Sequence, residues 1–181
     1  TPGGSVIVTA IEADRLRSVA EHRRFLDRLT APSERKSGSV GVGIVGYGPF
    51  GGMCYTHGLA ATETDGLYLA GICDTNAERR DAALVDFPHV SAYTELEALA
   101  GDDNVSVVIV ATPPVLHAPI ALALLRAGKH VVVEKPMCLT AADADMLLGH
   151  FRDAESECKA LLFATAQVHA FLGSIRLQTF R

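Results

Sequence analysis

Short apolar runs rich in Val and Ile recur along this chain of 181 residues, and amphipathic segments separate them. The runs predict strands over Ser39–Val45, Leu67–Cys73, Val90–Tyr93, Val105–Ala111, His130–Glu134 and Leu161–Ala164. The segments between them predict helices over Pro49–Ala61, Ala77–Phe87, Thr94–Ala100, Leu116–Ala127 and Thr140–Phe151. Strands that are apolar throughout are typical of a parallel sheet buried on both faces. The sequence therefore predicts an α/β fold, a doubly wound parallel sheet whose ligand site lies at the carboxyl ends of the strands.

Composition excludes several other classes of protein. Hydrophobic residues make up 49% of the chain and charged residues 20%, which suits a folded domain and not a disordered one. The formal net charge of −5 argues against a nucleic-acid partner, and no apolar run is long enough to span a membrane. The cysteines lack the spacing of a metal site and are expected to be core thiols in the cytoplasm; they are Cys54, Cys73, Cys138 and Cys158.

The first 38 residues form a separate unit in this interpretation. Apolar residues recur at helical spacing within Ala10–Leu29, and the polar stretch Ala31–Gly38 interrupts that pattern. We expect residues 1–38 to be an N-terminal extension, a packing helix followed by a linker.

Thr94 and Thr140 are expected to cap the helices that follow them, and Gly128 is expected to end a third helix.

A glycine-rich turn joins the first predicted strand to the first helix of the sheet. Gly46, Gly48 and Gly51 match the pattern G-x-G-x-x-G in the required context, between a strand and a helix. Gly46 permits a tight turn, Gly48 lets a pyrophosphate approach the backbone, and Gly51 lets the helix pack closely. The pattern predicts a Rossmann-type domain for NAD or NADP, with a cofactor-binding loop of Gly46, Tyr47, Gly48, Pro49, Phe50 and Gly51.

Asp74 ends the second predicted strand, 23 residues beyond Gly51, near the separation expected for a ribose-binding acid. A carboxylate there accepts hydrogen bonds from the adenosine ribose and repels a 2′-phosphate. Arg79 and Arg80 follow closely and are able to receive a phosphate, so the pattern favours NAD only modestly over NADP. Asp74 is also a candidate N-cap of the next helix, and the two roles are compatible.

Two further motifs follow the fourth and fifth predicted strands. They are Thr112–His117 (TPPVLH) and Glu134–Pro136 (EKP). In this order after the glycine loop, the stretch Val40–Leu148 resembles the Gfo/Idh/MocA family of NAD(P)-dependent oxidoreductases. The EKP motif argues against other two-domain reductases, such as those that resemble homoserine dehydrogenase or dihydrodipicolinate reductase.

The resemblance implies roles for these residues. It places Thr112, Pro113 and His117 beside the ribose and nicotinamide, and it makes Lys135 the catalytic candidate that positions substrate and assists proton transfer. The remaining cofactor-site residues, which shape the turn around a commonly cis Lys–Pro peptide, are Glu134 and Pro136.

Family members continue into a second α/β domain that supplies substrate residues and most of the dimer interface. Here residues 39–165 are expected to be the dinucleotide-binding domain and residues 166–181 the start of a largely missing, truncated substrate domain; His169 is assigned no role. Three interpretations stay open. The chain is a fragment of an oxidoreductase acting on a secondary alcohol of a sugar or cyclitol, a non-catalytic dinucleotide-binding module, or part of a complex that supplies the missing domain. Whether it is an enzyme is therefore open, and a full-length form allows a homo-oligomer.

Overall fold

The structure is a computed structural model that describes residues 38–48, 53–153 and 162–164, with the backbone alone for 151–153 and 162–164. Several predictions lie outside this part of the chain: the helix in Ala10–Leu29, the linker before Gly38, and the segment 166–181. The same is true of Pro49, Phe50 and Gly51 of the glycine loop, and of Cys158 and His169.

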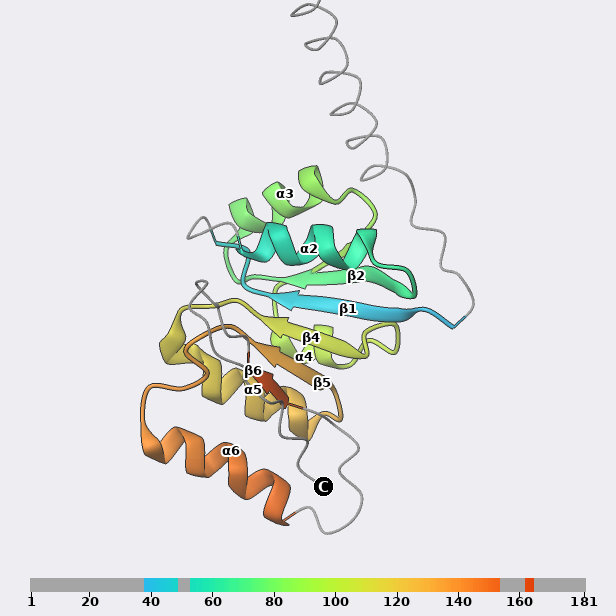
Figure 1. Cartoon of the computed structure of the whole chain (residues 1–181). Helices are drawn as coiled ribbons and strands as arrows, with labels where there is room; N and C mark the ends of the chain where they lie inside the picture. The colour runs from blue at the N-terminus through green and yellow to red at the C-terminus, as the bar shows by residue number, and fades with distance from the viewer. Residues whose placement is uncertain (1–37, 49–52, 154–161, 165–181) are drawn as a thin grey trace, which may run out of the picture.

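Six parallel strands form one sheet in the order β3-β2-β1-β4-β5-β6 (Figure 1). The strands are β1 (Val40–Val45), β2 (Leu67–Cys73), β3 (Ser91–Tyr93), β4 (Val107–Val110), β5 (His130–Val133) and β6 (Leu162–Ala164). The chain builds outward from β1 through β2 to β3, then returns to add β4 on the other side of β1. Such a reversal of strand order opens a crevice at the carboxyl ends of β1 and β4, where doubly wound folds bind ligands. The predicted fold class is confirmed.

Helices follow every strand but the last one described, as expected for parallel connections. They are α2 (Met53–Glu63), α3 (Ala77–Asp86), α4 (Leu96–Ala100), the 3₁₀ turn η1 (Pro114–Leu116), α5 (His117–Arg126) and α6 (Ala141–Asp153). Helices α2 and α3 cover one face of the sheet, while α4 and α5 cover the other, with α6 packed against α5 (Figure 1).

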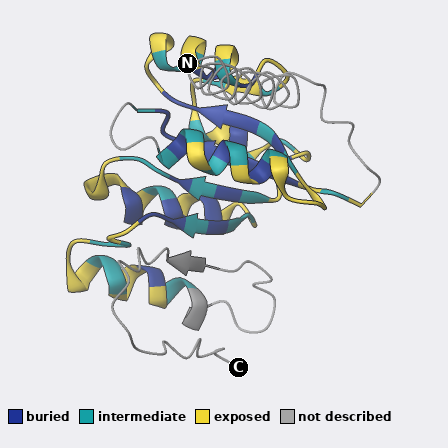
Figure 2. Cartoon of the chain, turned by 45° about the horizontal axis from the view of Figure 1, so that its top comes forward, coloured by how far each residue is buried: buried dark blue, intermediate teal, exposed yellow. Residues whose placement is uncertain are grey.

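Two hydrophobic cores lie on the two faces of the sheet, which separates the helical layers (Figure 2). The core beneath α2 and α3 contains Ile44, Ile72 and Phe87, whereas the opposite core contains Val108, Leu124 and other side chains of β4, β5, α4, α5 and α6. Burial on both faces explains why the strands are apolar throughout rather than alternating. The sheet is thus a rigid platform for the loops at its carboxyl edge.

Glycine in β1 allows a helix to lie close to the sheet. A Cβ atom on Gly43 would lie 3.0 Å from Val105 Cγ1 and 3.2 Å from Leu99 Cδ1. These distances are shorter than ordinary carbon contacts, so a side chain would force Leu99 of α4 away from β1. Gly43 therefore serves packing and is not part of the functional site.

The helix ends confirm some predicted caps and correct others. Thr140 Oγ1 accepts a hydrogen bond of 3.1 Å from the Asp143 N–H, and Gly128 follows α5 with a φ of 77°. The predicted Thr94 cap is wrong, because α4 begins at Leu96 after Glu95, which makes no side-chain capping bond. Strand β3 stays paired with β2 as far as Tyr93, so the chain turns into the helix only after Thr94.

Candidate functional site

The carboxyl ends of four neighbouring strands bring the sequence motifs together at one edge of the sheet. Residues 46–48 follow β1, Asp74 follows β2, Thr112 follows β4 and Glu134 follows β5. Motifs that are separated by dozens of residues therefore meet because the strands are parallel and adjacent. This edge is the candidate site.

Gly46 makes the tight turn predicted for the first residue of the loop. Its φ is +92°, a conformation that strongly favours glycine. A Cβ atom there would lie 2.9 Å from both the Ala111 carbonyl oxygen and Thr112 Cγ2. The Gly46 N–H donates a hydrogen bond of 2.8 Å to the Cys73 carbonyl. The turn is therefore fixed against both β2 and the residues that follow β4.

Asp74 holds the glycine loop as well as its own turn. One carboxylate oxygen accepts a hydrogen bond of 2.8 Å from the Tyr47 N–H, and the other accepts one of 2.9 Å from the Asn76 N–H. The side chain of Asn76, not that of Asp74, caps α3 by accepting from the Arg79 N–H, so the alternative cap role of Asp74 is wrong. Each carboxylate oxygen has a second lone pair, which leaves capacity for a ribose hydroxyl.

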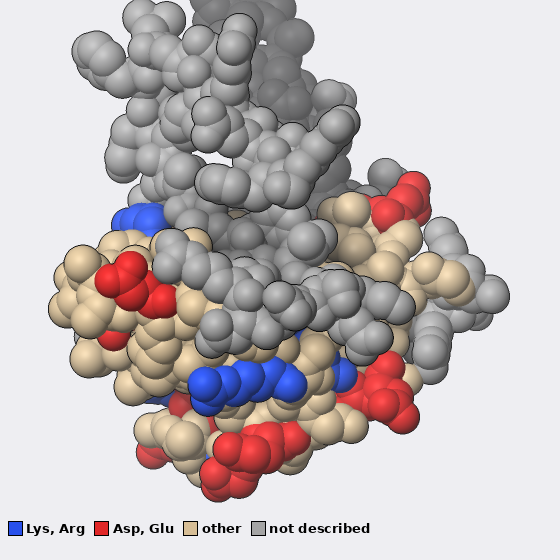
Figure 3. All heavy atoms as spheres, turned by 90° about the horizontal axis from the view of Figure 1, so that it is seen from below, with Lys and Arg blue, Asp and Glu red and all other residues tan. Residues whose placement is uncertain are grey.

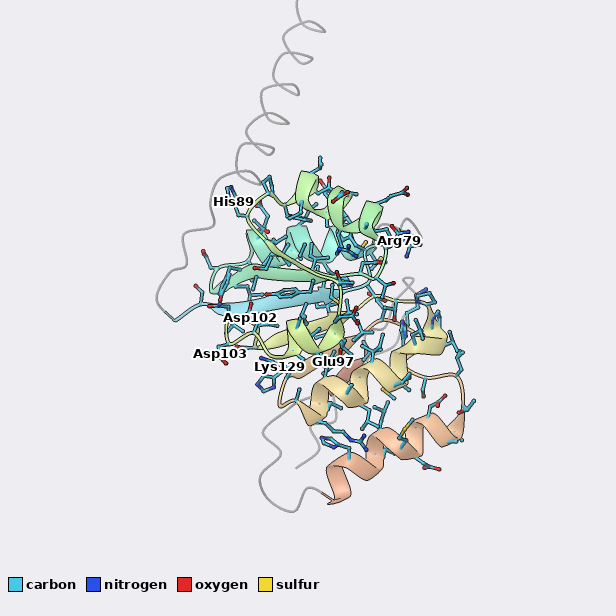
Figure 4. The ribbon with its side chains drawn as sticks, turned by 180° about the vertical axis from the view of Figure 1, so that it is seen from behind. Arg79, His89, Glu97, Asp102, Asp103 and Lys129 are labelled. Atoms are coloured by element: carbon cyan, nitrogen blue, oxygen red, sulfur yellow. The ribbon has the colours of Figure 1, made fainter. Side chains whose placement is uncertain are left out.

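The two arginines after Asp74 have different environments. Arg80 Nη1 donates to the carbonyls of Asp74 and Thr75, at 2.8 and 3.0 Å. Arg79 Nη1 lies 3.7 Å from Asp74 Oδ2, and its side chain is 40% exposed. Figure 4 places Arg79 at the end of the sheet opposite Asp102 and Lys129. Arg79 therefore borders the candidate site, whereas Arg80 braces the backbone.

Gly48 lies next to Arg79. Among the described residues, a Cβ atom on Gly48 would meet only Arg79 atoms, at 3.6 and 3.7 Å, which are ordinary van der Waals distances. The described part of the chain thus does not require glycine at this position. The absent side chain instead leaves room for a ligand against the backbone, as the fingerprint expects for a pyrophosphate.

Thr112 presents a polar atom with no partner inside the described part of the protein. Its Oγ1 is buried and makes no hydrogen bond to another described group. Unpaired buried hydroxyls are uncommon, and such a group calls for a ligand or water. Together with the open backbone at Gly48, this hydroxyl shows that the residues present fit a dinucleotide at this edge.

The Glu134–Pro136 turn contains the predicted cis peptide between Lys135 and Pro136. Glu134 is 7% exposed, and its Oε1 lies 2.7 Å from Nε2 of His57 on α2. Its Oε2 accepts a hydrogen bond of 3.1 Å from the Lys135 N–H. Lys135 itself is exposed. The carboxylate is thus a structural anchor, and the lysine extends from the turn it anchors.

His57 is a site residue that the sequence reasoning missed. The signal was its helical spacing, because His57 stands three residues after Cys54 and four before Ala61, both buried on α2. That spacing places His57 on the inner side of the helix, where a polar side chain needs a partner. The partner, Glu134, is 77 residues away and was not deducible from the pattern.

His117 is buried and touches two loops of the site. Its exposed fraction is 1%. Nδ1 lies 2.7 Å from the Pro136 carbonyl oxygen, and Nε2 lies 2.7 Å from the Thr112 carbonyl oxygen. The ring therefore links the loop after β4 to the turn after β5. Contact of His117 with a cofactor stays a prediction.

Burial makes the titratable side chains beneath the loop unreactive at neutral pH. It raises the pKa of the Cys73 thiol to about 11 and also raises that of Cys54. The pKa of the Tyr47 phenol is raised by burial and by its hydrogen bond of 2.6 Å to Asp86 Oδ2. A thiol in its neutral form is a poor nucleophile. Cys54 and Cys73 are therefore core residues, as predicted, and not candidates for covalent chemistry.

Other kinds of site find little support in the part of the chain that the structure describes. Among those residues, no group of three or more His, Cys, Asp or Glu side chains could hold a metal ion. No helix among them has the length and apolar character needed to cross a membrane. On the face shown in Figure 3, Lys and Arg form a short strip bordered by Asp and Glu.

Residues 40–160 match the sequence profile of the Gfo/Idh/MocA oxidoreductase family, described as having an NAD-binding Rossmann fold. The chain belongs to this family, as the resemblance in its motifs implied. Its fold is that of a nicotinamide-dinucleotide-binding domain.

Individual relatives agree with this assignment. A scyllo-inositol 2-dehydrogenase (NADP(+)) of Bacillus subtilis is 37% identical over 113 residues, which are 62% of this chain and 30% of the relative. An NAD-binding protein from Listeria innocua superposes with a TM-score of 0.61 at 32% identity, over 70% of this chain and 35% of that one. The WlbA dehydrogenase of Bordetella pertussis, solved with NADH and UDP-GlcNAcA, superposes with a TM-score of 0.62 at 28% identity. The match covers 70% of this chain and 37% of that one. The chain spans about a third of the length of these relatives.

Proposed function

We propose that this chain is the cofactor-binding part of an NAD(P)-dependent oxidoreductase that oxidises a secondary alcohol of a sugar, cyclitol or similar compound. The observation that carries the proposal is the buried Oγ1 of Thr112, which has no hydrogen-bond partner among the described residues and lies at the same edge as Gly48. The substrate class is supported by the relative named as an inositol dehydrogenase and by the relative solved with a UDP-sugar. The division into residues 1–38, 39–165 and 166–181 remains a prediction.

The cofactor contacts follow from the positions of the loops. Gly46, Gly48 and the start of α2 receive the pyrophosphate, since a helix N-terminus and an open backbone favour an anion. Asp74 accepts the adenosine ribose hydroxyls. Thr112 donates its hydroxyl to the ribose or carboxamide on the nicotinamide side, while the neighbouring Pro113 shapes that wall of the site.

Lys135 is the proposed proton-transfer residue. When bound, the nicotinamide supplies the hydride acceptor for the carbinol carbon. The hydroxyl proton of the same carbinol must leave, and a lysine amine in its neutral form accepts it. Lys135 is exposed in the turn that Glu134 anchors, which supports a role for its amine beside the substrate carbon.

Cofactor choice depends on two side chains that lie 3.7 Å apart, Asp74 and Arg79. The Asp74 carboxylate disfavours a 2′-phosphate, while the exposed Arg79 is able to pair with one. We propose that NAD is preferred modestly and that NADP also binds. The relatives are consistent with either, since one is named for NADP(+) and another was solved with NADH.

The test is a fluorescence titration of the chain with NADH and with NADPH, for the parent and for Gly48→Val. We expect saturable binding by the parent and loss of binding in a folded Gly48→Val variant, because valine occupies the pyrophosphate space. Gly149→Val is the matched control, since a Cβ atom at Gly149 meets no described residue within 4 Å. Unchanged affinity in Gly48→Val would refute the loop assignment.

A second candidate function is that of a dinucleotide-binding module without catalysis. A turnover assay distinguishes this module from the enzyme. Incubation with NAD or NADP and inositol, followed at 340 nm, distinguishes the two. Cofactor binding without reduction of NAD or NADP favours the module, whereas turnover lost in Lys135→Met favours the enzyme.

A further inference from the structure

The Glu134–Pro136 turn is held from two sides by histidines that come from different helical layers. His57 belongs to α2, which covers one face of the sheet, and His117 belongs to α5, which covers the other (Figure 1). The turn itself follows β5, which lies between β4 and β6 in the sheet. Contacts from both layers therefore converge on the three residues that include Lys135.

His57 acts on the turn through the Glu134 side chain. The 2.7 Å contact joins Nε2 of His57 to Oε1, while Oε2 accepts the N–H of Lys135. The side chains of His57 and Glu134 are 19% and 9% exposed, so water competes little for this contact. A buried charge–imidazole contact has a defined geometry, and its loss is costly. The position of the Lys135 backbone is thus tied to α2.

His117 acts on the turn through the Pro136 backbone. Both of its ring nitrogens lie 2.7 Å from carbonyl oxygens, those of Pro136 and Thr112. Carbonyl oxygens only accept, so each contact is a hydrogen bond when the ring nitrogen that makes it carries a hydrogen. A side-chain amide presents its donors on one nitrogen and cannot replace both ring positions. His117 therefore sets the distance between the Thr112 loop and the lysine turn.

We infer that His57 and His117 are positioning residues that together fix Lys135 relative to the Thr112 side of the cofactor site. This inference rests on the proposed function for the role of Lys135. The contacts themselves do not depend on it. At 1% exposure His117 does not reach a substrate, and His57 is engaged with Glu134. Both histidines act through the turn and are distinct from the proton-transfer residue.

The first experiment needs no substitution. Nitrogen-15 NMR of the full chain reports whether a ring N–H of His117 exchanges with water. The bridge predicts a ring N–H that is protected from exchange, because the ring is buried. A ring with no protected N–H would overturn the bridge.

The second experiment measures hydrogen exchange of the Lys135 amide, whose N–H is bonded to Glu134. We expect His57→Leu and His117→Gln each to speed this exchange at least about tenfold. His57→Gln should restore most of the protection, because its amide nitrogen replaces Nε2 as a donor to Glu134. His117→Asn should not restore it, because one amide cannot serve two carbonyls. Rescue by an amide at position 57 but not at position 117 is not expected if the two histidines only contribute to stability.

The matched control is His89→Gln, which removes an exposed histidine from the loop before β3. Figure 4 shows His89 at the end of the molecule away from Arg79 and the candidate site. Exchange of the Lys135 amide within about twofold of the parent in His57→Leu and His117→Gln would overturn the inference. Failure of the parent to bind NADH would contradict the proposed function alone, since the exchange measurement requires no cofactor.

Discussion

The backbone N–H of Tyr47 donates a hydrogen bond of 2.8 Å to Oδ2 of Asp74, across 27 residues of sequence. This bond joins the glycine loop after β1 to the end of β2. Asp74 therefore shapes the site in addition to any contact with a ribose. Substitutions at Asp74 affect the loop itself, and changes in cofactor choice must be separated from changes in stability.

Replacement of Asp74 should destabilise the protein. Asp74→Ala removes the acceptor for two backbone N–H groups, of Tyr47 and Asn76, and the Tyr47 bond is buried. We expect a loss of roughly 1–3 kcal/mol in the free energy of unfolding, measured by urea denaturation. Asp74→Asn keeps one acceptor oxygen and should lose less. The control is Asp81→Ala, an exposed residue of α3, expected within about 0.5 kcal/mol of the parent. Equal stability of the two alanine variants would contradict this account.

Arg79 should discriminate between the two cofactors. Because its exposed guanidinium borders both Gly48 and Asp74, Arg79→Ala should weaken NADPH binding at least about tenfold and change NADH binding far less. Arg80→Ala is the comparison. Arg80 donates to the carbonyls of Asp74 and Thr75, so its removal should affect both cofactors to a similar degree. A fall in NADPH and NADH affinity by the same factor in Arg79→Ala would exclude a 2′-phosphate role.

Alanine substitution at two helical glycines should change the stability of the protein in opposite directions. A Cβ atom on Gly58 of α2 would lie 2.5 Å from Cζ of Phe87, whose ring is buried and packs against Tyr55. Gly58→Ala should therefore destabilise the protein by about 1–3 kcal/mol through overpacking. A Cβ atom on Gly149 of α6 would meet no described residue within 4 Å, and Gly149→Ala should stabilise the protein by up to about 1 kcal/mol. Thermal unfolding of both variants measures these changes in stability. Changes in the same direction would be inconsistent with the packing described.

Stability should fall at alkaline pH, in part because of Cys73. Burial raises the pKa of its thiol to about 11 in the folded protein, against a value of 9.0 for an unperturbed thiol. The folded state thus holds this proton more tightly, and the contribution to stability is complete below pH 9 and is lost as pH rises through 11. Cys73→Ala should make the decline in unfolding free energy between pH 9 and 11 less steep. Identical slopes for the parent and the variant, measured by urea denaturation under reducing conditions, would show that Cys73 does not contribute.

Local sequence was sufficient for the elements and for most of the motif residues. Runs rich in Val and Ile marked β1, β4 and β5, because strands buried on both faces need apolar side chains. Gly46 was identified because its turn requires a positive φ, which the structure shows as +92°. Prediction was weaker at helix starts. The Thr94 cap was wrong and Asn76 replaced Asp74 as a cap, since these depend on where a strand stops pairing.

The sequence by itself determined the parallel α/β fold, the glycine loop and the family, because those depend on local periodicity and on motifs that occur in a fixed order. Only the tertiary structure decided which side chains meet at the carboxyl edge. The pairing of His57 with Glu134, and the bridge of His117 between Thr112 and Pro136, join residues from separate helices and loops. Such contacts depend on strand order and on the layers packed across the sheet. A polar side chain buried among those layers must find its partner in space, and its sequence neighbours do not specify that partner.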